Sequence, residues 1–284
     1  MNISIGGFSF HRLLQAGKQD MFQYITDCKA LGATQLDPWN AQLAPIRQAD
    51  DIIKAGRDPA HAQLTAQDDD YLTRVKAAAD TAGLPFGCIA VDGAHIYEPD
   101  PEARKANRIL ADRWLEVAHL LGAQQVRIDA GGPKEMPDAV FGILVLEYRD
   151  LVARGHRKGI EILMENHWGP SVVPENVVRI LDAVEGLGLL FDTHNWEPDL
   201  REEGWQLCAK YARSTHVKTF SFDENGNEPS VAVPRAIRLL AEAGYDGCWG
   251  VESCPTDGDE YGAARKTIAL IRRSLETLGA AKTR

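Results

Sequence analysis

The stretch GIEILMENHWGP, residues 159–170, contains the unit from which the fold of this chain can be read. A glycine opens it, an apolar run from Ile160 to Glu165 follows, and the polar residues Asn166 and His167 come next. Glycine just past a helix supplies the left-handed residue that ends the helix, and a short apolar run indicates a buried strand. The stretch therefore predicts the end of a helix, a strand, and a polar strand end.

The same unit recurs along the whole chain. Glycines follow amphipathic segments at positions 32, 83, 122, 159 and 244, and helical spacing predicts helices over Pro101–Leu121 and Val231–Ala243. Apolar runs predict eight strands: Ile3–Phe10, Thr34–Trp39, Phe86–Asp92, Gln125–Ala130, Ile160–Glu165, Leu187–Asp192, Thr215–Phe220 and Cys248–Glu252. Eight strands, each followed by a helix and without a break in composition, predict one (β/α)₈ TIM barrel domain over residues 1–284.

A doubly wound open sheet is the alternative architecture. It would normally carry a glycine-rich phosphate loop after its first strand, and Gly6-Gly7-Phe8 does not match that pattern. Two segments interrupt the regular alternation of predicted strands and helices. Residues 40–68 are expected to form an extended loop insertion after the second strand, and residues 223–230 form a second insertion after the seventh. The first is compatible with a lid or with a subunit contact in a homo-oligomer, because barrels carry their functional loops after strand C-termini.

Composition excludes several partner classes. The chain has 31 lysines and arginines against 41 aspartates and glutamates, a net charge of -10, and no basic run, so nucleic acid is not expected as a partner. No apolar stretch approaches the roughly 20 residues that a membrane span needs. The N-terminal MNISIGGFSF lacks the features of a signal peptide, and the five cysteines are scattered without a CxxC pair. We therefore expect a cytoplasmic protein with reduced thiols.

Acidic residues and histidines concentrate at the predicted strand ends, where the active sites of such barrels lie. Glu165, Asp192, His216 and Glu252 come from four consecutive strands. If they converge, three ionised carboxylates would repel one another by several kcal/mol in a low-dielectric site, and a divalent cation would resolve that conflict. Oxygen ligands with one nitrogen favour Mn²⁺, Mg²⁺ or Co²⁺, with Zn²⁺ also compatible. The alternative is four separate polar residues satisfied by helix N-termini and water.

Alternation along a strand decides which side chains would enter the barrel. In the strand that ends at Glu165, Ile162 and Met164 share one parity, whereas Glu165 shares the other with Leu163. The pattern leaves open which parity points inward.

Four motifs near these residues resemble the sugar phosphate isomerase/epimerase family of xylose isomerase-like barrels. They are MENH at 164–167, LLFDTHN at 189–195, HVKTFSFDENG at 216–226 and GYDGCWGVE at 244–252. The resemblance spans the whole chain and implies metal ligation by Glu165, Asp192, His216 and Glu252. In ketose epimerases of this superfamily the two metal-bound glutamates also act as the acid–base pair, which here would be Glu165 and Glu252.

The chain departs from many family members at one position. Three residues after Asp192 they have a histidine, whereas this chain has Asn195, with His194 one place earlier. A few relatives with an ENH motif cleave 3-oxo-C-glycosides by β-elimination and use the histidine of that motif as base, which here is His167. The expected function is therefore a metal-dependent isomerase or epimerase acting beside the carbonyl of a ketose or keto-sugar. The alternative is a metal-dependent lyase on 3-oxo-glycosides with His167 as base.

Two other functions are weaker alternatives: an apurinic-site nuclease, which the acidic charge argues against, and a non-catalytic sugar-binding barrel. Tryptophans at strand ends indicate a small-molecule sugar as the partner, because aromatic rings pack on the apolar faces of sugars, although each ring could equally plug the barrel top. Lys218 could bind a substrate oxygen or pair with a carboxylate, and Arg127 and Asp129 could pair with each other or touch a hydroxyl. The predicted substrate-binding residues are Trp39, Trp168, Trp196, His194, Asn195 and Lys218.

Overall fold

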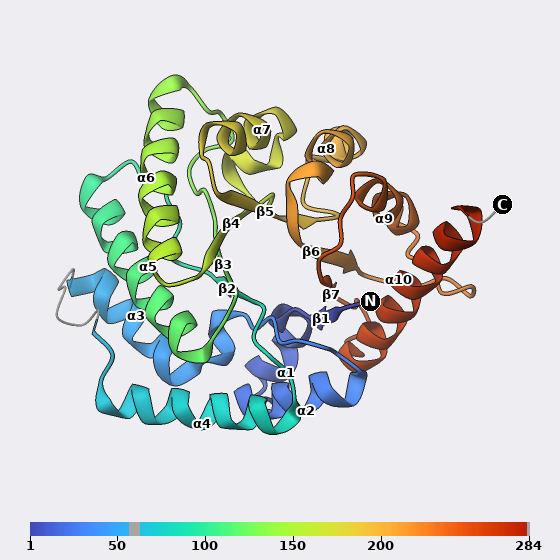
Figure 1. Ribbon diagram of the computed structural model, residues 1–284, viewed down its shortest axis with the longest axis horizontal. Coiled ribbons are helices and arrows are strands. Elements are labelled where there is room, and N and C mark those ends of the chain that lie inside the picture. Colours follow the sequence, from blue (N-terminus) through green and yellow to red (C-terminus); the bar gives the residue numbers. More distant parts are fainter. Residues whose placement is uncertain (57–62, 283–284) are drawn as a thin grey trace.

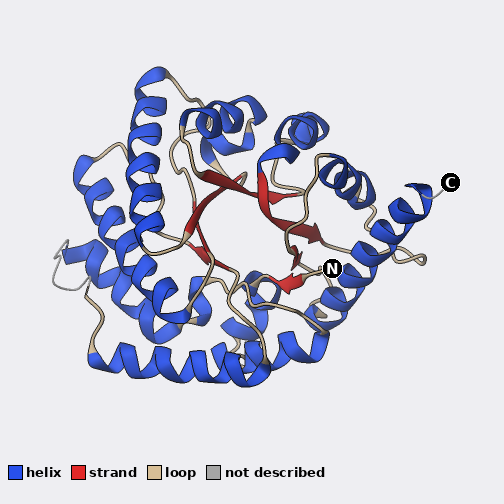
Figure 2. Ribbon diagram, in the orientation of Figure 1, coloured by secondary structure: helices blue, strands red, loops and turns tan. Residues whose placement is uncertain are grey.

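The sheet of the computed structural model, which describes residues 1–56 and 63–282, is a ring of parallel strands surrounded by helices (Figure 2). Its strand order is β1-β7-β6-β5-β4-β3-β2, and each pair of neighbours is parallel. Within the described residues the strands are β1 (Ile3–Ile5), β2 (Cys88–Val91), β3 (Gln125–Ile128), β4 (Glu161–Glu165), β5 (Leu187–Asp192), β6 (Ala212–Thr219) and β7 (Trp249–Ser253). The predicted parallel barrel is confirmed.

The place of the expected second strand, Thr34–Trp39, is taken by an irregular segment between β1 and β2. It makes only isolated bridges, Gly6 with Asp37, Leu36 with Phe86, and Trp39 with Ala90. The prediction of a regular strand here is wrong, and Pro38 supplies one physical reason, because its nitrogen has no hydrogen to donate to a ladder. The first strand is also shorter than expected, since residues 7–10 form the 3₁₀ helix η1 (Gly7–Phe10).

Helices form the outer layer (Figure 1). They are α1 (His11–Gln15), α2 (Met21–Leu31), α3 (Ala44–Gly56), α4 (Ala66–Ala82), α5 (Pro101–Leu121), α6 (Asp138–Arg157), α7 (Pro174–Ala183), α8 (Arg201–Cys208), α9 (Val233–Glu242) and α10 (Glu260–Lys282), with the short 3₁₀ helices η2 (Asn40–Gln42), η4 (Gly169–Val172), η5 (Pro198–Leu200) and η6 (Ala209–Tyr211). Helix α5 has the predicted bounds because Asp100 caps its first turn and Gly122, at φ 72°, ends it.

The segment 40–68 is not an extended loop where the structure describes it. Residues 40–42 form η2, residues 44–56 form α3, and α4 begins at Ala66. Residues 57–62 of this insertion lie outside the described residues. Ile46 and Ile53 are fully buried, and their seven-residue spacing places them on one side of α3; Leu43, just before the helix, is buried too. The helix therefore forms because it buries an apolar face against the neighbouring helices α5 and α4.

Two separate apolar clusters show which side of β4 faces the inside of the barrel. Cys88, Leu163 and Leu190 form a small cluster of their own, whereas Ile162 and Met164 belong to the large core cluster. Ile162 faces α6, since a Cβ added at Gly155 of that helix would lie 2.7 Å from the Ile162 Cδ1 atom. The side chain of Leu163 therefore points into the barrel, and Glu165, of the same parity, does so too.

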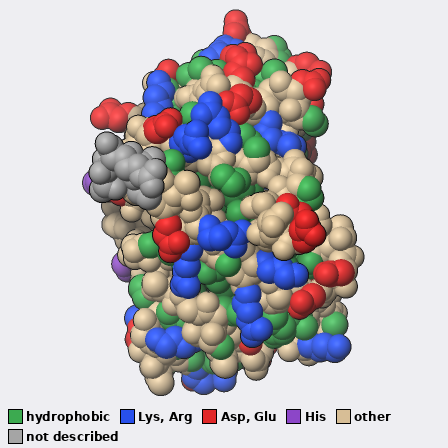
Figure 3. Space-filling view, turned by 90° about the vertical axis from the view of Figure 1, so that its right-hand side faces the viewer, with side chains coloured by type: hydrophobic (Ala, Val, Ile, Leu, Met, Phe, Trp, Pro, Cys, Tyr) green, Lys and Arg blue, Asp and Glu red, His purple; other side chains and the backbone are tan. Residues whose placement is uncertain are grey.

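The described helices include none that combines the length and the apolar character needed to cross a membrane. On the face drawn in Figure 3, basic and acidic side chains are interspersed, and neither sign gathers into one large patch.

Candidate functional site

The strand registers place the predicted site residues in one inward-facing layer near the C-terminal end of the barrel. Asp192 on β5 is paired with His216 on β6, and Lys218 on β6 is paired with Glu252 on β7. Glu165 on β4 is paired with Leu190, two residues before Asp192, so its side chain points to the same side of the sheet as that of Asp192. The convergence of the four predicted ligands follows from this register.

Three of the four predicted metal ligands offer atoms close to a common point. One ligand atom each from Glu165, Asp192 and His216 lies within 4.8 Å of the others, and all three residues are buried. Glu252 is not a member of that group, although its Oε1 lies 3.6 Å from the Nδ1 atom of His216. The Nδ1 atom of His216 is also 3.1 Å from Oε1 of Glu165. This carboxylate and imidazole cluster can hold a metal ion.

Local hydrogen bonds hold Asp192 in place. Its Oδ1 accepts from the backbone N–H groups of His194 and Asn195 at 2.6 and 2.9 Å, which leaves Oδ2 to face the cluster. Asn166 bridges the ends of β4 and β5, because its amide nitrogen donates to the Asp192 carbonyl at 2.9 Å and its oxygen accepts from the Asp192 N–H at 2.8 Å. The asparagine of the ENH motif therefore fixes the strand ends on which the ligands lie.

Three carboxylate oxygen atoms in the cluster lack a hydrogen-bond donor and could serve as ligands of a divalent cation. Oε2 of Glu165, Oδ2 of Asp192 and Oε2 of Glu252 are buried and accept no well-formed hydrogen bond, although each lies at ion-pair distance from Arg127 or Lys218. Buried carboxylate oxygens usually have such partners, and groups without them need an explanation. Hard oxygen donors with one imidazole nitrogen are a suitable ligand set for a hard divalent ion.

A cavity of about 70 Å³ opens above these residues. Glycine and aromatic residues from the β1 side form one wall, and charged strand-end residues form the other. The lining residues are Gly6, Gly7, Phe8, Asp37, Trp39, Ala90, Asp92, Arg127, Glu165, His167, His216, Lys218 and Glu252. Gly7 has to be a glycine here, because a Cβ would lie 2.4 Å from the Trp39 nitrogen.

Arg127 links three carboxylates on one side of the cavity. Its Nη1 atom lies 2.9 Å from Oδ1 of Asp92 and 3.0 Å from Oδ2 of Asp129, and its Nε lies 2.9 Å from Oε2 of Glu165. The ion pair between Arg127 and Asp129, one of the two interpretations of their spacing, is present. Burial alone would raise the pKa of Glu165, but the charges of Arg127 and His216 outweigh it and hold that pKa below its usual value.

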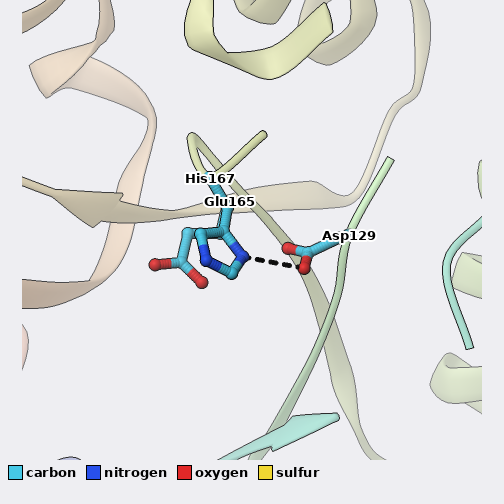
Figure 4. A group of neighbouring side chains, drawn as sticks. All are labelled: Asp129, Glu165 and His167. Carbon is cyan, nitrogen blue, oxygen red and sulfur yellow. Dashed lines mark hydrogen bonds and ion pairs between the residues drawn. The ribbon is translucent and has the colours of Figure 1, made fainter. Parts of the chain in front are cut away.

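His167 lies between Asp129 and Glu165 at the edge of the cavity (Figure 4). Its Nδ1 is 3.0 Å from Oδ2 of Asp129, an oxygen that also accepts from Nε1 of Trp168 at 3.2 Å. Burial would lower the pKa of His167, but Glu165 and Asp129 outweigh it and raise the pKa to about 9. Asp129 therefore fixes the orientation of the imidazole, and the other ring nitrogen is left for a different partner.

His216 and Asp192 have shifted pKa values of different origin. Burial would lower the pKa of His216, but Glu252 and Glu165 raise it to about 9. Burial raises the pKa of Asp192 to about 6 against the opposing charge of Lys218. Such shifts are expected where several carboxylates share a buried site.

The three tryptophans predicted to bind a sugar have different positions. Trp39 lines the cavity, where Phe8 meets its ring edge-on at 5.3 Å, and Trp168 is 37% exposed beside the site. Trp196 is only 2% exposed and packs in the core against Phe191 and Gly204. Trp196 is therefore not among the residues that line the cavity, and its ring packs against α8, where Gly204 leaves space for it.

The other predicted substrate-binding residues lie around Asp192. Asn195 is half-buried and its amide nitrogen lies 3.5 Å from Oε1 of Glu165. His194 turns its ring toward Phe220 at 4.8 Å and is not among the residues that line the cavity. Burial and the charge of Arg201 lower the pKa of His194 to about 4, so its ring is neutral at pH 7. Lys218 lines the cavity but is paired with carboxylates.

Sequence reasoning did not assign several residues of this site. Phe8 enters it through η1, which no periodic pattern indicated, and Asp37 enters it from the irregular second segment. Asp92 accepts from Nε1 of Trp39 at 2.8 Å and so joins the aromatic wall to Arg127. The two-residue spacing of Arg127 and Asp129 did indicate that they could pair, because residues two apart share one side of a strand.

The amino-acid sequence of this chain is similar to known proteins over parts of its length. A family model described as a xylose isomerase-like TIM barrel matches residues 51–274. The C-glycoside deglycosidase alpha subunit of Microbacterium trichothecenolyticum is 34% identical over 95 residues, which cover 29% of this chain and 26% of that protein. The corresponding subunit from Arthrobacter globiformis is 30% identical over 94 residues, which cover 31% of this chain and 26% of the relative. The match spans about a quarter of these relatives.

Solved structures with the same fold include several enzymes that act on sugars. The 3-keto-D-glucoside 4-epimerase from E. coli superposes with a TM-score of 0.66 at 15% identity, covering 90% of this chain and 95% of the other. An L-ribulose 3-epimerase reaches a TM-score of 0.71 at 13% identity, covering 100% and 97%. A xylose isomerase-like barrel protein from Mycobacterium smegmatis in complex with magnesium has a TM-score of 0.68 at 18% identity, covering 97% of each chain. These likenesses establish the fold.

Proposed function

Because the chain belongs to the xylose isomerase-like TIM barrel family, we propose that it is a divalent-metal-dependent isomerase or epimerase. Its reaction would move a proton on the carbon next to the carbonyl of a ketose or keto-sugar. The observation that carries this proposal is the cluster of Glu165, Asp192 and His216, with Glu252 beside them. Glu165, His216 and Glu252 line a cavity that also has an aromatic wall.

Glu165, Asp192, His216 and Glu252 would hold the ion, and Mn²⁺ is the ion we propose, with Mg²⁺, Co²⁺ and Zn²⁺ as alternatives. The orphaned oxygens of the three acids support this assignment. When bound, the ion would supply positive charge that polarises the substrate carbonyl and stabilises negative charge on its oxygen.

The protein groups would handle the proton. Glu165 and Glu252 come from strands that are separated by β5 and β6, so they approach the cavity from different sides. One carboxylate would take the proton from carbon on one face of the sugar, and the other would return a proton on the opposite face. Positioned acids and bases of this kind contribute typically about 10²–10⁴-fold to a rate.

An uncharged sugar suits the cavity better than a phosphorylated one. Phe8 and Trp39 offer an aromatic surface against which the apolar face of a sugar can pack. Arg127 and Lys218, the cations that line the cavity together with the two histidines, already lie against carboxylates. A phosphate would have to compete with those carboxylates for them, whereas hydroxyl groups could bind to the acids directly.

A lyase that cleaves 3-oxo-glycosides is the second candidate, and two observations favour it. The matched curated relatives are C-glycoside deglycosidase subunits. His167 lines the cavity with its Nδ1 held by Asp129. In this reaction His167 would have to be deprotonated, which its pKa of about 9 favours at alkaline pH. Its free ring nitrogen would then remove the proton from carbon next to the carbonyl, and the bond from the neighbouring carbon to the aglycone would break with its electron pair leaving on the aglycone.

Solvent exchange tests the shared chemistry, and one substitution separates the two candidates. Purified protein would be analysed for bound metal and incubated in D₂O with ketoses and with 3-oxo-glycosides, each with and without Mn²⁺. Metal-dependent deuterium at carbon is expected, and its absence from every substrate would contradict the proposal. His167→Ala should abolish lyase turnover but leave much of an epimerase driven by Glu165 and Glu252. His156→Ala, on the exposed end of α6, is the control and should match the wild type.

A further inference from the structure

The ammonium group of Lys218 is surrounded by protein oxygen atoms. Its Nζ lies 2.6 Å from Oε2 of Glu252, 3.2 Å from Oδ2 of Asp192 and 3.0 Å from Oδ1 of Asn195. Of these contacts, the one with Asn195 is a hydrogen bond, and the two with the carboxylates are ion pairs. The side chain is only 11% exposed although it lines the cavity. The charge of Lys218 is therefore already compensated by two carboxylates of the protein.

The two acids bound by Lys218 are two of the four proposed metal ligands. Asp192 is completely buried, and Glu252 is 7% exposed. Carboxylates buried without a compensating charge are costly, and removing one partner of a buried ion pair is strongly destabilising. Of the compensating cations, Arg127 lies against Glu165, and His216 lies nearer to Glu165 than to Glu252. Lys218 is thus the main partner of Asp192 and Glu252.

From this placement we infer that Lys218 is an internal counter-ion that holds Asp192 and Glu252 when no metal is bound and competes with the metal for them. This inference rests on the proposed metal site. The exclusion of Glu252 from the group of atoms within 4.8 Å supports it, because the carboxylate is turned toward Nζ. For Glu252 to become a ligand, the Lys218 ammonium has to release its oxygen. The lysine therefore stabilises the protein without metal and weakens metal binding.

Lys218→Met tests the competition directly, because methionine fills similar space without charge. Mn²⁺ would be titrated calorimetrically into chelator-treated protein, and the melting temperature would be measured with and without Mn²⁺. We expect Lys218→Met to bind Mn²⁺ about tenfold more tightly or better, to melt at a lower temperature than wild type without metal, and to be stabilised more strongly by Mn²⁺. Lys134→Met, which removes an exposed pair with Glu197 at 2.9 Å, is the matched control and should change neither.

An Mn²⁺ affinity that is unchanged or weaker in a folded Lys218→Met protein would overturn the inference. If this variant folds only when Mn²⁺ is present, the counter-ion role is supported. If Lys218→Met folds neither with nor without Mn²⁺, the Mn²⁺ affinity and melting temperature of Lys218→Gln are measured instead. In addition, the Nζ resonance of Lys218 in the wild-type protein is followed by lysine-selective nitrogen NMR. That resonance should be protected from exchange without metal and lose its protection as diamagnetic Mg²⁺ is added. A resonance that is unchanged at saturating Mg²⁺ would contradict competition.

Failure of this inference differs from failure of the proposed function. If wild type binds Mn²⁺ and exchanges deuterium but Lys218→Met binds no more tightly, only the role of Lys218 is wrong. If Lys218→Met binds more tightly but no substrate shows exchange in wild type, only the proposed reaction is wrong. Binding of Mn²⁺ by neither protein would overturn both the counter-ion role and the metal site.

Discussion

Glu165 connects the two halves of the charged network at the level of single residues. On one side its Oε2 lies 2.9 Å from Arg127, and on the other its Oε1 lies 3.1 Å from His216. It also belongs to both groups of side chains that could hold a metal ion, one with Asp192 and His216 and one with Asp129 and His167. A change at this residue should therefore affect metal binding more than a change elsewhere on β4.

Glu165→Gln should weaken Mn²⁺ binding by more than about 100-fold, since even changes behind the ligands of a metal site cost 10–100-fold in affinity. A carboxamide keeps the shape of the side chain but removes its negative charge. Glu161→Gln, at the other end of the same strand, is the control; Glu161 is 35% exposed, binds Gln125 and should not affect the metal. Calorimetric titration of both variants gives the comparison, and equal affinities would exclude Glu165 as a ligand.

At the scale of elements, helix α6 packs closely on strand β4 through a glycine. A Cβ at Gly155 would lie 2.7 Å from Cδ1 of Ile162 and 2.8 Å from the backbone oxygen of Ile160. Backbone cannot yield as a flexible side chain does, so the approach of α6 to the strand that carries Glu165 depends on this residue. Gly142, on the same helix, has no atom within 4 Å of the same position.

Alanine at these two positions should change stability in opposite directions. Gly155→Ala should destabilise the fold by about 1–3 kcal/mol, because the added methyl group overpacks the interface with β4. Gly142→Ala should stabilise it by about 0.5–1 kcal/mol, because alanine favours the helix and meets no neighbour. Urea unfolding followed by circular dichroism measures both. A shift of the same sign in the two variants would show that α6 does not depend on the glycine contact.

At the scale of the whole molecule, the barrel is closed by side-chain and backbone bonds where a regular strand is missing. Asp37 accepts from the Ser4 hydroxyl at 2.5 Å on the β1 side and from the Cys88 N–H at 2.9 Å on the β2 side. The Gln35 amide donates to it at 2.9 Å. This one buried carboxylate therefore joins both ends of the sheet.

Asp37→Ala should destabilise the barrel by about 2–4 kcal/mol, because it leaves buried donors on Ser4 and Cys88 without an acceptor. Thermal unfolding monitored by calorimetry measures the loss. Asp246→Ala, at an exposed position before β7, should stay within about 0.5 kcal/mol of wild type. If the two variants unfolded alike, closure of the ring would not depend on Asp37.

The parts of this protein that could be predicted from sequence are those with local causes. Apolar runs and C-terminal glycines determine where most strands and helices lie, and β4, β5 and α5 follow that pattern closely. Helix α3 is not expected from the place of its segment after a strand, although the spacing of Ile46 and Ile53 is helical. The acids and histidines at strand ends were predictable because parallel strands of one barrel end at the same edge.

The sequence by itself therefore determined the order of the elements, the barrel and the set of residues at its C-terminal edge, since each follows from local periodicity and from the rule that parallel strands align. Only the tertiary structure decided that the side of β4 with Leu163 faces inward, that Trp196 packs in the core, and that Lys218 binds Asp192 and Glu252. These outcomes depend on packing and charge between segments distant in the chain, and no local pattern encodes which of several available partners a side chain meets.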